Sequence, residues 1–239
     1  MIIVIAITGI VGSMVALFLR VPLDSYVAQD RRARLTDTAD TALRRMARDI
    51  RLALPNSVRV TAAGSVVEFL GTRSGGRYRA QGGGDILDFT LADNSFDILG
   101  PAIEMRAGDR IAVYNLGIPG ADAWAGETLA DYVGAVGSVT NITIASKQFP
   151  LASPGNRFQV VDGPVSYVCA AGRLTRFWGY DPAVGVTAAT PRALLATRVS
   201  ACSFDYQPGV GGLVSMTLSL SLAGETIRLH ANTQVSNQP

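Results

Sequence analysis

The sequence predicts an α+β protein in which one long N-terminal helix, membrane-spanning and then amphipathic, packs on an antiparallel β-sheet head. The first nineteen residues carry no charge, which is typical of a membrane-spanning helix. Apolar residues then recur every three or four positions up to about residue 54, and after Pro55 their period changes to two. We therefore expect three parts: residues 1–19, residues 20–54 and a β-rich head over residues 55–239.

The opening run MIIVIAITGIVGSMVALFL would form a helix of about 28 Å, close to the hydrocarbon thickness of a bilayer. It lacks the basic n-region and the small-residue cleavage site of a signal peptide. The arginines that follow the run would keep the head in the cytoplasm, so we expect a basic stretch upstream of Met1 that reverses this orientation. The residues assigned to the membrane and assembly surface are Ile2, Ile3, Val4, Ile5, Ile7, Gly9, Ile10, Val11, Val15, Leu17 and Phe18.

The helix is expected to continue well beyond the apolar run, because the sequence from Asp24 to Leu54 contains neither Gly nor Pro. Pro22 predicts a kink between the two halves, and Pro55 followed by Asn56 predicts the end of the helix. The apolar stripe expected to pack the helix on the sheet consists of Leu35, Ala39, Ala42, Leu43, Met46 and Ile50.

The head is predicted from short β-branched and aromatic segments that Gly, Pro, Asn and Asp separate. The last two segments, LVSMTLSLSL and TIRLHANTQV, flank the turn AGE and predict a hairpin. We expect loops in the Gly-rich stretches 71–85 and 117–127, a strand over ILDFTL (86–91), and at most a turn or two of helix in PRALLATRV (191–199).

The two cysteines, Cys169 and Cys202, both lie in segments that read as strands. With only one histidine in the chain and no CxxC spacing, they do not form a zinc-binding pattern. A disulfide is the preferred interpretation because the apolar opening implies export, and two separate buried thiols are the alternative.

The charge distribution argues against nucleic-acid binding. Residues 1–54 carry eight arginines against five aspartates, whereas the rest of the chain carries thirteen basic residues against fourteen acidic ones. A nucleic-acid-binding domain concentrates positive charge on its folded body. Arginines in the Gly-rich stretch could still contact phosphates, and the three candidates are Arg73, Arg77 and Arg79.

Several other polar and aromatic groups partly match known site patterns. Asp85 and Asp88 are interpreted as a solvated sheet edge and not as an acid/base pair. A partial calcium-loop pattern lacks the central Gly and terminal Glu, and its members are Asp93, Asn94 and Asp97. His230 is expected to be an ordinary strand residue. An Arg/aromatic group that could stack on a sugar or base, but more simply packs beside the cysteines, consists of Arg176, Phe177, Trp178 and Tyr180.

No motif of a hydrolase, a metalloprotease or a P-loop enzyme occurs, so we expect neither an enzyme nor a cofactor.

The opening run resembles the N-terminal helix of type IV pilins and type II secretion pseudopilins, with Gly9 at the place of a glycine inside that helix. In that family a basic leader ending in Gly, then a Phe-initiated start with an assembly Glu, precede this part of the helix. Further segments resemble minor pilins of MSHA-type pili, and these are RMARDIRLALPNSVRV (45–60), PVSYVCAAGRLTRFWGY (164–180), LLATRVSACSFDY (194–206) and ANTQVSNQP (231–239).

The resemblance implies a structural subunit of the initiating or tip complex of an MSHA-like pilus. Its partners would be other minor and major pilins, the inner membrane before assembly and the inner-membrane assembly platform. Its location would be the inner membrane with a periplasmic head, and later the extracellular pilus of a Gram-negative bacterium. The alternatives are a tip adhesin that binds DNA or a surface glycan, and a J-type pseudopilin of a type II secretion system.

Overall fold

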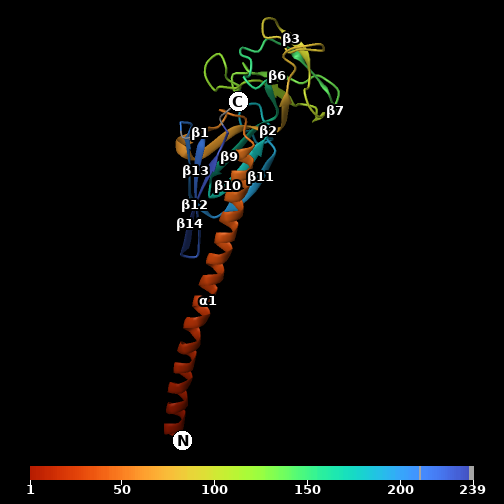
Figure 1. Ribbon diagram of the computed structural model, residues 1–239. Helices are drawn as coiled ribbons and strands as arrows, with labels where there is room; N and C mark the ends of the chain where they lie inside the picture. The colour runs from red at the N-terminus through yellow and green to blue at the C-terminus, as the bar shows by residue number, and fades with distance from the viewer. Residues whose placement is uncertain (210, 237–239) are drawn as a thin grey trace.

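Helix α1 dominates the shape of the molecule and spans Ile2–Arg51 (Figure 1). This computed structural model describes residues 1–209 and 211–236, with the side chains of residues 16–24 left out. The first half of α1 extends away from all strands, and the second half runs into the head. The helix ends at Leu52, just before Pro55, and Arg48 and Arg51 lie in its last turn, where their charge is favourable to the helix dipole.

The rest of the described chain is built from short and long strands. These are β1 (Arg59–Thr61), β2 (Val66–Arg77), β3 (Asp93–Asp97), β4 (Ile103–Met105), β5 (Arg110–Ala112), β6 (Leu129–Asp131), β7 (Gly137–Val139), β8 (Asn141–Lys147), β9 (Arg157–Ala170), β10 (Arg173–Trp178), β11 (Arg192–Thr197), β12 (Val199–Gln207), β13 (Leu213–Leu222) and β14 (Glu225–Gln234), with a 3-10 turn at Ala62–Gly64.

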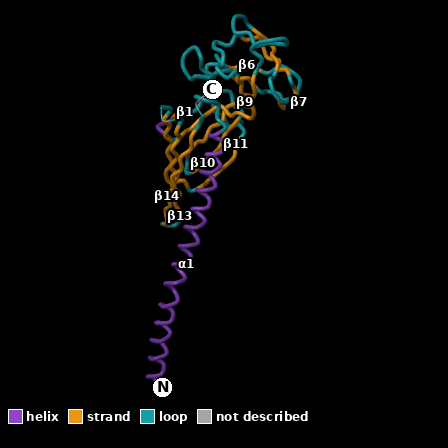
Figure 2. Tube along the Cα trace, in the orientation of Figure 1, coloured by secondary structure: helices purple, strands orange, loops and turns teal. Residues whose placement is uncertain are grey.

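Two antiparallel sheets hold the second half of α1. The first has the order β1-β2-β9-β10-β11, with β5 and β6 attached beside β9, and the second has the order β12-β13-β14. The tube in Figure 2 shows α1 running between these strands. The chain crosses from the first sheet to the second at one residue, Arg198, whose φ of 60° turns the backbone sharply between β11 and β12.

A shared hydrophobic core joins the helix to both sheets. Its helical members are Leu35, Ala39, Ala42, Leu43, Met46 and Ile50, all at most 4% exposed. The first sheet contributes Phe69 and Tyr167, and the second contributes Met216 and Leu218. Because side chains of three layers meet here, the helix is held from two sides along its second half.

A distal lobe, residues 78–156, is inserted between β2 and β9. These two strands form a long antiparallel ladder whose last pair is Arg77 opposite Arg157. The lobe contains the small sheets β3-β8 and β4-β7 and lies at the end of the head opposite the free half of α1 (Figures 1 and 2). It has its own core, which includes Tyr78, Phe96 and Ile142.

The structure corrects the predicted fold class. Among the residues with described side chains, no helix combines the length and apolar character needed to cross a membrane. The predicted membrane-spanning half, and with it the transmembrane and pilin-like description of the fold, is therefore not supported. The chain is mainly β, and its described strands form four separate sheets around more than one core, where a single sheet under a helix was expected.

Two local expectations were also wrong, and a third segment holds strand where a turn or two of helix was allowed. The stretch 71–77, predicted as loop from its glycines, belongs to β2, because glycines tolerate the close approach of β9. ILDFTL (86–91) contains no strand, and PRALLATRV (191–199) contains β11 and the start of β12 instead of helix. Pro22, where a kink was predicted, belongs to residues 16–24, whose side chains are not described.

Candidate assembly surface

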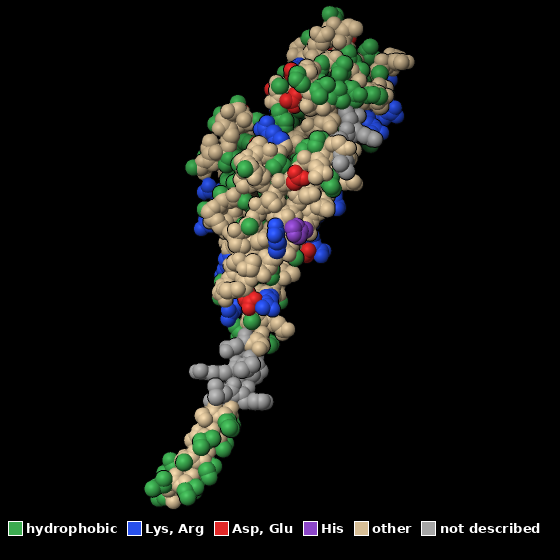
Figure 3. Space-filling model, turned by 90° about the vertical axis from the view of Figure 1, so that its left-hand side faces the viewer, with side chains coloured by type: hydrophobic (Ala, Val, Ile, Leu, Met, Phe, Trp, Pro, Cys, Tyr) green, Lys and Arg blue, Asp and Glu red, His purple; other side chains and the backbone are tan. Residues whose placement is uncertain are grey.

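The first part of α1 exposes apolar side chains at successive positions along the helix, and Figure 3 shows them on the face turned to the viewer. Ile2 is 84% exposed, and even the less exposed Val11 retains 53%. The large apolar side chains exposed over residues 1–15 are those of Met1, Ile2, Ile3, Val4, Ile5, Ile7, Ile10, Val11, Met14 and Val15. We call residues 1–15 the apolar segment. The predicted members Leu17 and Phe18 lie outside the described side chains.

The apolar segment contains two hydroxyl side chains and two glycines. Thr8 donates to the carbonyl of Val4 at 2.7 Å, and Ser13 donates to that of Ile10 at 2.8 Å, so both hydroxyls are satisfied within the helix. A side chain at Gly9 or Gly12 would meet nothing within 4 Å. These glycines therefore have no packing role within the described chain, although each lowers helix stability by about 1 kcal/mol relative to Ala.

The second half of α1 is fixed at both ends to β14. Arg32 forms a salt bridge with Glu225 at the start of that strand. Near the end of the helix, Arg51 Nε donates to Thr233 Oγ1 at 3.2 Å, and Thr233 Oγ1 donates to the carbonyl of Ala47 at 3.5 Å. The second half of the helix thus follows β14 along its length.

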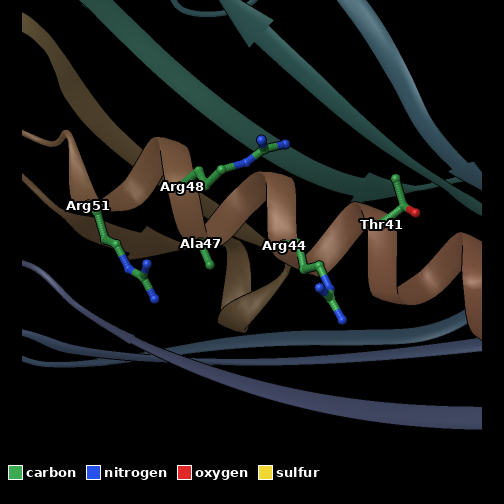
Figure 4. Close-up of a pocket in the computed structure, with 5 residues that line it drawn as sticks. All are labelled: Thr41, Arg44, Ala47, Arg48 and Arg51. Carbon is green, nitrogen blue, oxygen red and sulfur yellow. The ribbon is translucent and has the colours of Figure 1, made fainter.

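The outward face of this half is basic. Figure 4 shows the side chains of Arg44, Arg48 and Arg51 extending from the helix between the two sheets. Together with Thr41 and Ala47 they line a shallow cavity of about 400 Å³. Arg44 is paired with Asp40 one turn earlier. This face carries three of the eight arginines of residues 1–54.

A half-buried network secures the helix to the first sheet. Asp49 on α1 accepts hydrogen bonds from Tyr167 on β9 and Arg176 on β10, both at 2.7 Å. The pKa of Tyr167 lies well above its ordinary value. Burial is the main cause, and the hydrogen bond to the Asp49 carboxylate is the second. The Arg176 guanidinium also lies 5.0 Å from the centroid of the Trp178 ring.

A second network joins the head to the loop over residues 117–127. Tyr180 donates a short hydrogen bond to Glu68, which also forms a salt bridge with Arg59. Arg59 stacks on Trp124 of the loop at 3.7 Å from the ring centroid. The pKa of Tyr180 lies well above its ordinary value, mainly because the phenol is buried and next because it donates a hydrogen bond to Glu68. The polar groups of Arg176 and Tyr180 therefore already have partners within the fold.

Cys169 and Cys202 form a disulfide between β9 and β12. The bond therefore connects the two sheets that hold α1. It closes a loop with a sequence separation of 33 residues, which would stabilise the fold by about 3–4 kcal/mol in the chain-entropy model. Both cysteines are partly buried against the shared core.

The three arginines of the Gly-rich stretch have different surroundings. Arg73 forms a salt bridge with Asp109, whose side chain is 4% exposed, and Arg79 pairs with Asp97 at 3.1 Å. Arg77 Nε donates to the carbonyl of Gly155 at 3.2 Å, and Arg77 belongs to none of the salt bridges in the described part of the chain. The first two are thus neutralised within the fold, which leaves Arg77 as the member available to a ligand.

The distal carboxylates are used for internal hydrogen bonds. Asn141 donates to both Asp85 and Asp97, and the Asp85 amide donates to Asp97 at 3.0 Å. The hydrogen bond from Asn141, followed by that from the Asp85 amide, lowers the pKa of Asp97. Asp93 accepts the Asp88 amide at 2.8 Å. Within the described residues, no group of His, Cys, Asp and Glu side chains is arranged to hold a metal ion.

His230 lies on the exposed face of β14, and its Nδ1 is 2.9 Å from Thr217 Oγ1 on β13. The pair is open to solvent and has no carboxylate in hydrogen-bond contact with the imidazole among the interactions described. It has the character of a cross-strand polar pair.

Sequence reasoning missed the groups that fix the helix direction, namely Asp49, Glu225 and Thr233. Each pairs with a residue more than 100 positions away, so only the fold brings the partners together. Comparison with known proteins gives no further guidance: no family model, curated protein or solved structure matches the chain.

Proposed function

We propose that the chain is a structural subunit of a filament of the type IV pilus class, with the apolar segment as its assembly surface. The observation that carries the proposal is the exposure of nearly continuous apolar side chains over residues 1–15, on a helix whose second half is fixed in the head. Apolar patches of this kind mark interaction sites, and a helix that is apolar all round is buried in its working state.

The partners that would bury this segment are the corresponding helices of neighbouring subunits. Isoleucine and valine side chains supply apolar area, at roughly 25 cal/mol per Å² removed from water. Gly9 and Gly12 present bare backbone, which allows another helix to approach closely. The absence of an internal packing role for these glycines supports such a contact.

The fixed second half of α1 gives this assembly surface a defined geometry. If the helix could hinge where it enters the head, packing of helices would not determine where the heads lie. The pins at Arg32 and Thr233 and the network around Asp49 oppose such movement. Head positions in the filament would thus follow from the packing of the apolar segments.

The disulfide supports a location outside the reducing cytoplasm. The proposal therefore places the head in the periplasm before assembly and on the extracellular filament afterwards. The finer assignment, to an initiating or tip subunit similar to the minor pilin MshO of MSHA-type pili, rests on the sequence resemblance alone. Its partners would be the other minor and major pilins and the inner-membrane assembly platform, and no catalytic role is included.

Deletion of the gene tests the proposal. We expect the number of surface filaments to fall out of proportion to the abundance of this subunit, because an initiating subunit acts before the others are added. Electron microscopy of the deletion strain measures filament number. Normal piliation would refute the initiating role, and a secretion defect with normal pili would favour the pseudopilin alternative.

A matched pair of variants tests the assembly surface itself. Val11→Arg introduces a charge into the apolar segment, whereas Thr36→Arg introduces the same charge on an exposed position of the fixed half. Only Val11→Arg should abolish complementation of the deletion, while both proteins accumulate to similar levels with intact disulfides. Equal complementation by the two variants would contradict burial of residue 11 in an assembly.

A further inference from the structure

Two arginines stand opposite each other where the head passes into the distal lobe. Arg77 and Arg157 form the last pair of the β2–β9 ladder. Residues directly opposite in an antiparallel ladder project from the same face with Cβ atoms about 5 Å apart. Like charges in this arrangement repel each other, so the pair is a local cost that the rest of the fold tolerates.

No carboxylate in the described part of the chain neutralises this pair, since neither arginine belongs to any of its salt bridges. Arg77 Nε donates to the carbonyl of Gly155 at 3.2 Å. The Nε atom of Arg157 lies 3.2 Å from the place that a Cβ of Gly155 would occupy. Both side chains therefore approach Gly155 and lie close to each other.

An open groove of about 360 Å³ lies along the two arginines. Gly75 and Gly76 line it, and no side chain rises from either residue. A Cβ at Gly75 would lie 2.8 Å from the carbonyl oxygen of Phe158, and one at Gly76 would lie 3.0 Å from the Phe158 ring. The packing of β2 against β9 thus requires glycine at both positions, and of the two only Gly75, opposite Gln159, lies on the same face of the ladder as the arginines.

We propose that this groove binds the carboxylate of an acidic sugar of the uronic acid class. The planar guanidinium group pairs with a carboxylate through two parallel hydrogen bonds, and two such groups would offset their mutual repulsion by sharing the anion. Gln159 lines the same groove, and its amide can both donate to and accept from ring hydroxyls. The volume is at the small end of ligand sites and suits one or two sugar rings.

The site is independent of the proposed filament role, because it uses none of the residues of the apolar segment or of the fixed half of α1. It also differs from the predicted Arg/aromatic group, whose polar members already have partners within the fold. Failure of one proposal therefore leaves the other standing.

Titration of the full chain, kept in non-ionic detergent, with glucuronic acid and a glucuronate disaccharide tests this site. Glucose and a neutral disaccharide are the uncharged counterparts. We expect saturable shifts of the Gly75 and Gly76 amide resonances with the acidic sugars only. The double variant Arg77→Gln/Arg157→Gln should lose affinity on the order of tenfold or more, since charged hydrogen bonds disappear.

Matched variants separate recognition from folding. Arg192→Gln removes an exposed arginine on β11, away from the groove, and should leave binding unchanged. The double Gln variant should unfold at no lower temperature than the wild type, because a repulsive pair is removed. Arg77→Lys/Arg157→Lys keeps the charge but not the planar fork, and should also bind more weakly. Equal binding of glucose, equal competition by inorganic phosphate, unchanged binding by the double variant, or no saturable binding would overturn the proposal.

Discussion

The two halves of helix α1 carry the same kinds of apolar side chain but have opposite surroundings. Ile10 in the first half is 57% exposed, whereas Ile50 near the end of the second half is fully buried. The difference lies in the two sheets, which enclose the second half and never reach the first. An apolar helix therefore shows that something must cover it, but its own pattern does not show whether the cover comes from the same chain.

The largest expected effect contrasts one isoleucine from each half. Ile50→Ala should lower the free energy of unfolding by about 2–5 kcal/mol, because it leaves a cavity in the shared core. Ile10→Ala should change it by less than about 0.5 kcal/mol, because that side chain has no neighbours to lose. Urea unfolding followed by tryptophan fluorescence, in the same detergent for both variants, measures the two values. Equal losses would show that the first half also packs on its own head.

Removal of the disulfide tests the connection between the two sheets that enclose the helix. Cys169→Ala/Cys202→Ala should cost about 3–4 kcal/mol, since the unfolded chain regains the entropy of an open loop. The loss should appear as a lower thermal midpoint, measured by circular dichroism. Intact-mass analysis with and without a reductant provides the control, and two freely alkylated thiols in the native wild type would contradict the bond.

A smaller effect is expected at the network between the helix and the first sheet. Asp49→Asn should cost about 2 kcal/mol, because two hydrogen bonds to a half-buried carboxylate weaken. Asp40→Asn is the matched change on the same helix, and its exposed pair with Arg44 should contribute only about 0.3–0.5 kcal/mol. If both substitutions had the same small effect, the Asp49 network would not be what secures the helix.

The smallest effect is expected in the distal lobe. It tests whether acid lowers the local stability of the lobe separately from that of the helix. The pKa of Asp97 lies below its ordinary value of 3.8, so its contribution to stability is complete above that pH. The contribution is lost as the pH falls through the folded-state pKa. Hydrogen exchange of the Asp85 amide, corrected for its intrinsic pH dependence, should therefore show weaker protection below about pH 4. Asp97→Asn should remove that pH dependence and leave protection around Leu54 unchanged.

Much of the head could be read from the sequence because strand periodicity is a local signal. The hairpin of β13 and β14 follows from alternating residues around a short turn, and the buried stripe of α1 follows from its spacing of three and four. The division into four sheets could not be read in this way, because it depends on which strands pair over long distances. Gly75 and Gly76 illustrate the difficulty: glycine favours loops locally, but here it is required by the closeness of β9.

The candidate site was predictable only in part. The exposure of the apolar segment follows from composition once the head is known to lie elsewhere. Which arginine of the Gly-rich stretch stays available to a ligand does not follow from composition. Arg73 and Arg79 pair with carboxylates from other parts of the chain, and Arg77 does not pair with any in the described part. The membrane-spanning prediction was wrong: among the residues with described side chains, no helix combines the length and the apolar character needed to cross a membrane.

The chain enters and leaves the distal lobe through the two members of a single rung, Arg77 and Arg157. The ends of this seventy-nine-residue excursion, residues 78–156, are therefore about as close together as the ends of an ordinary hairpin turn. The chain therefore enters and leaves the lobe at one place, while β5 and the Arg73–Asp109 salt bridge join the lobe to the head elsewhere. A replacement lobe would have to supply a partner for β9 in place of β5, and cover Leu54 and Val161, which pack against Ala112 and Leu129 of the present lobe.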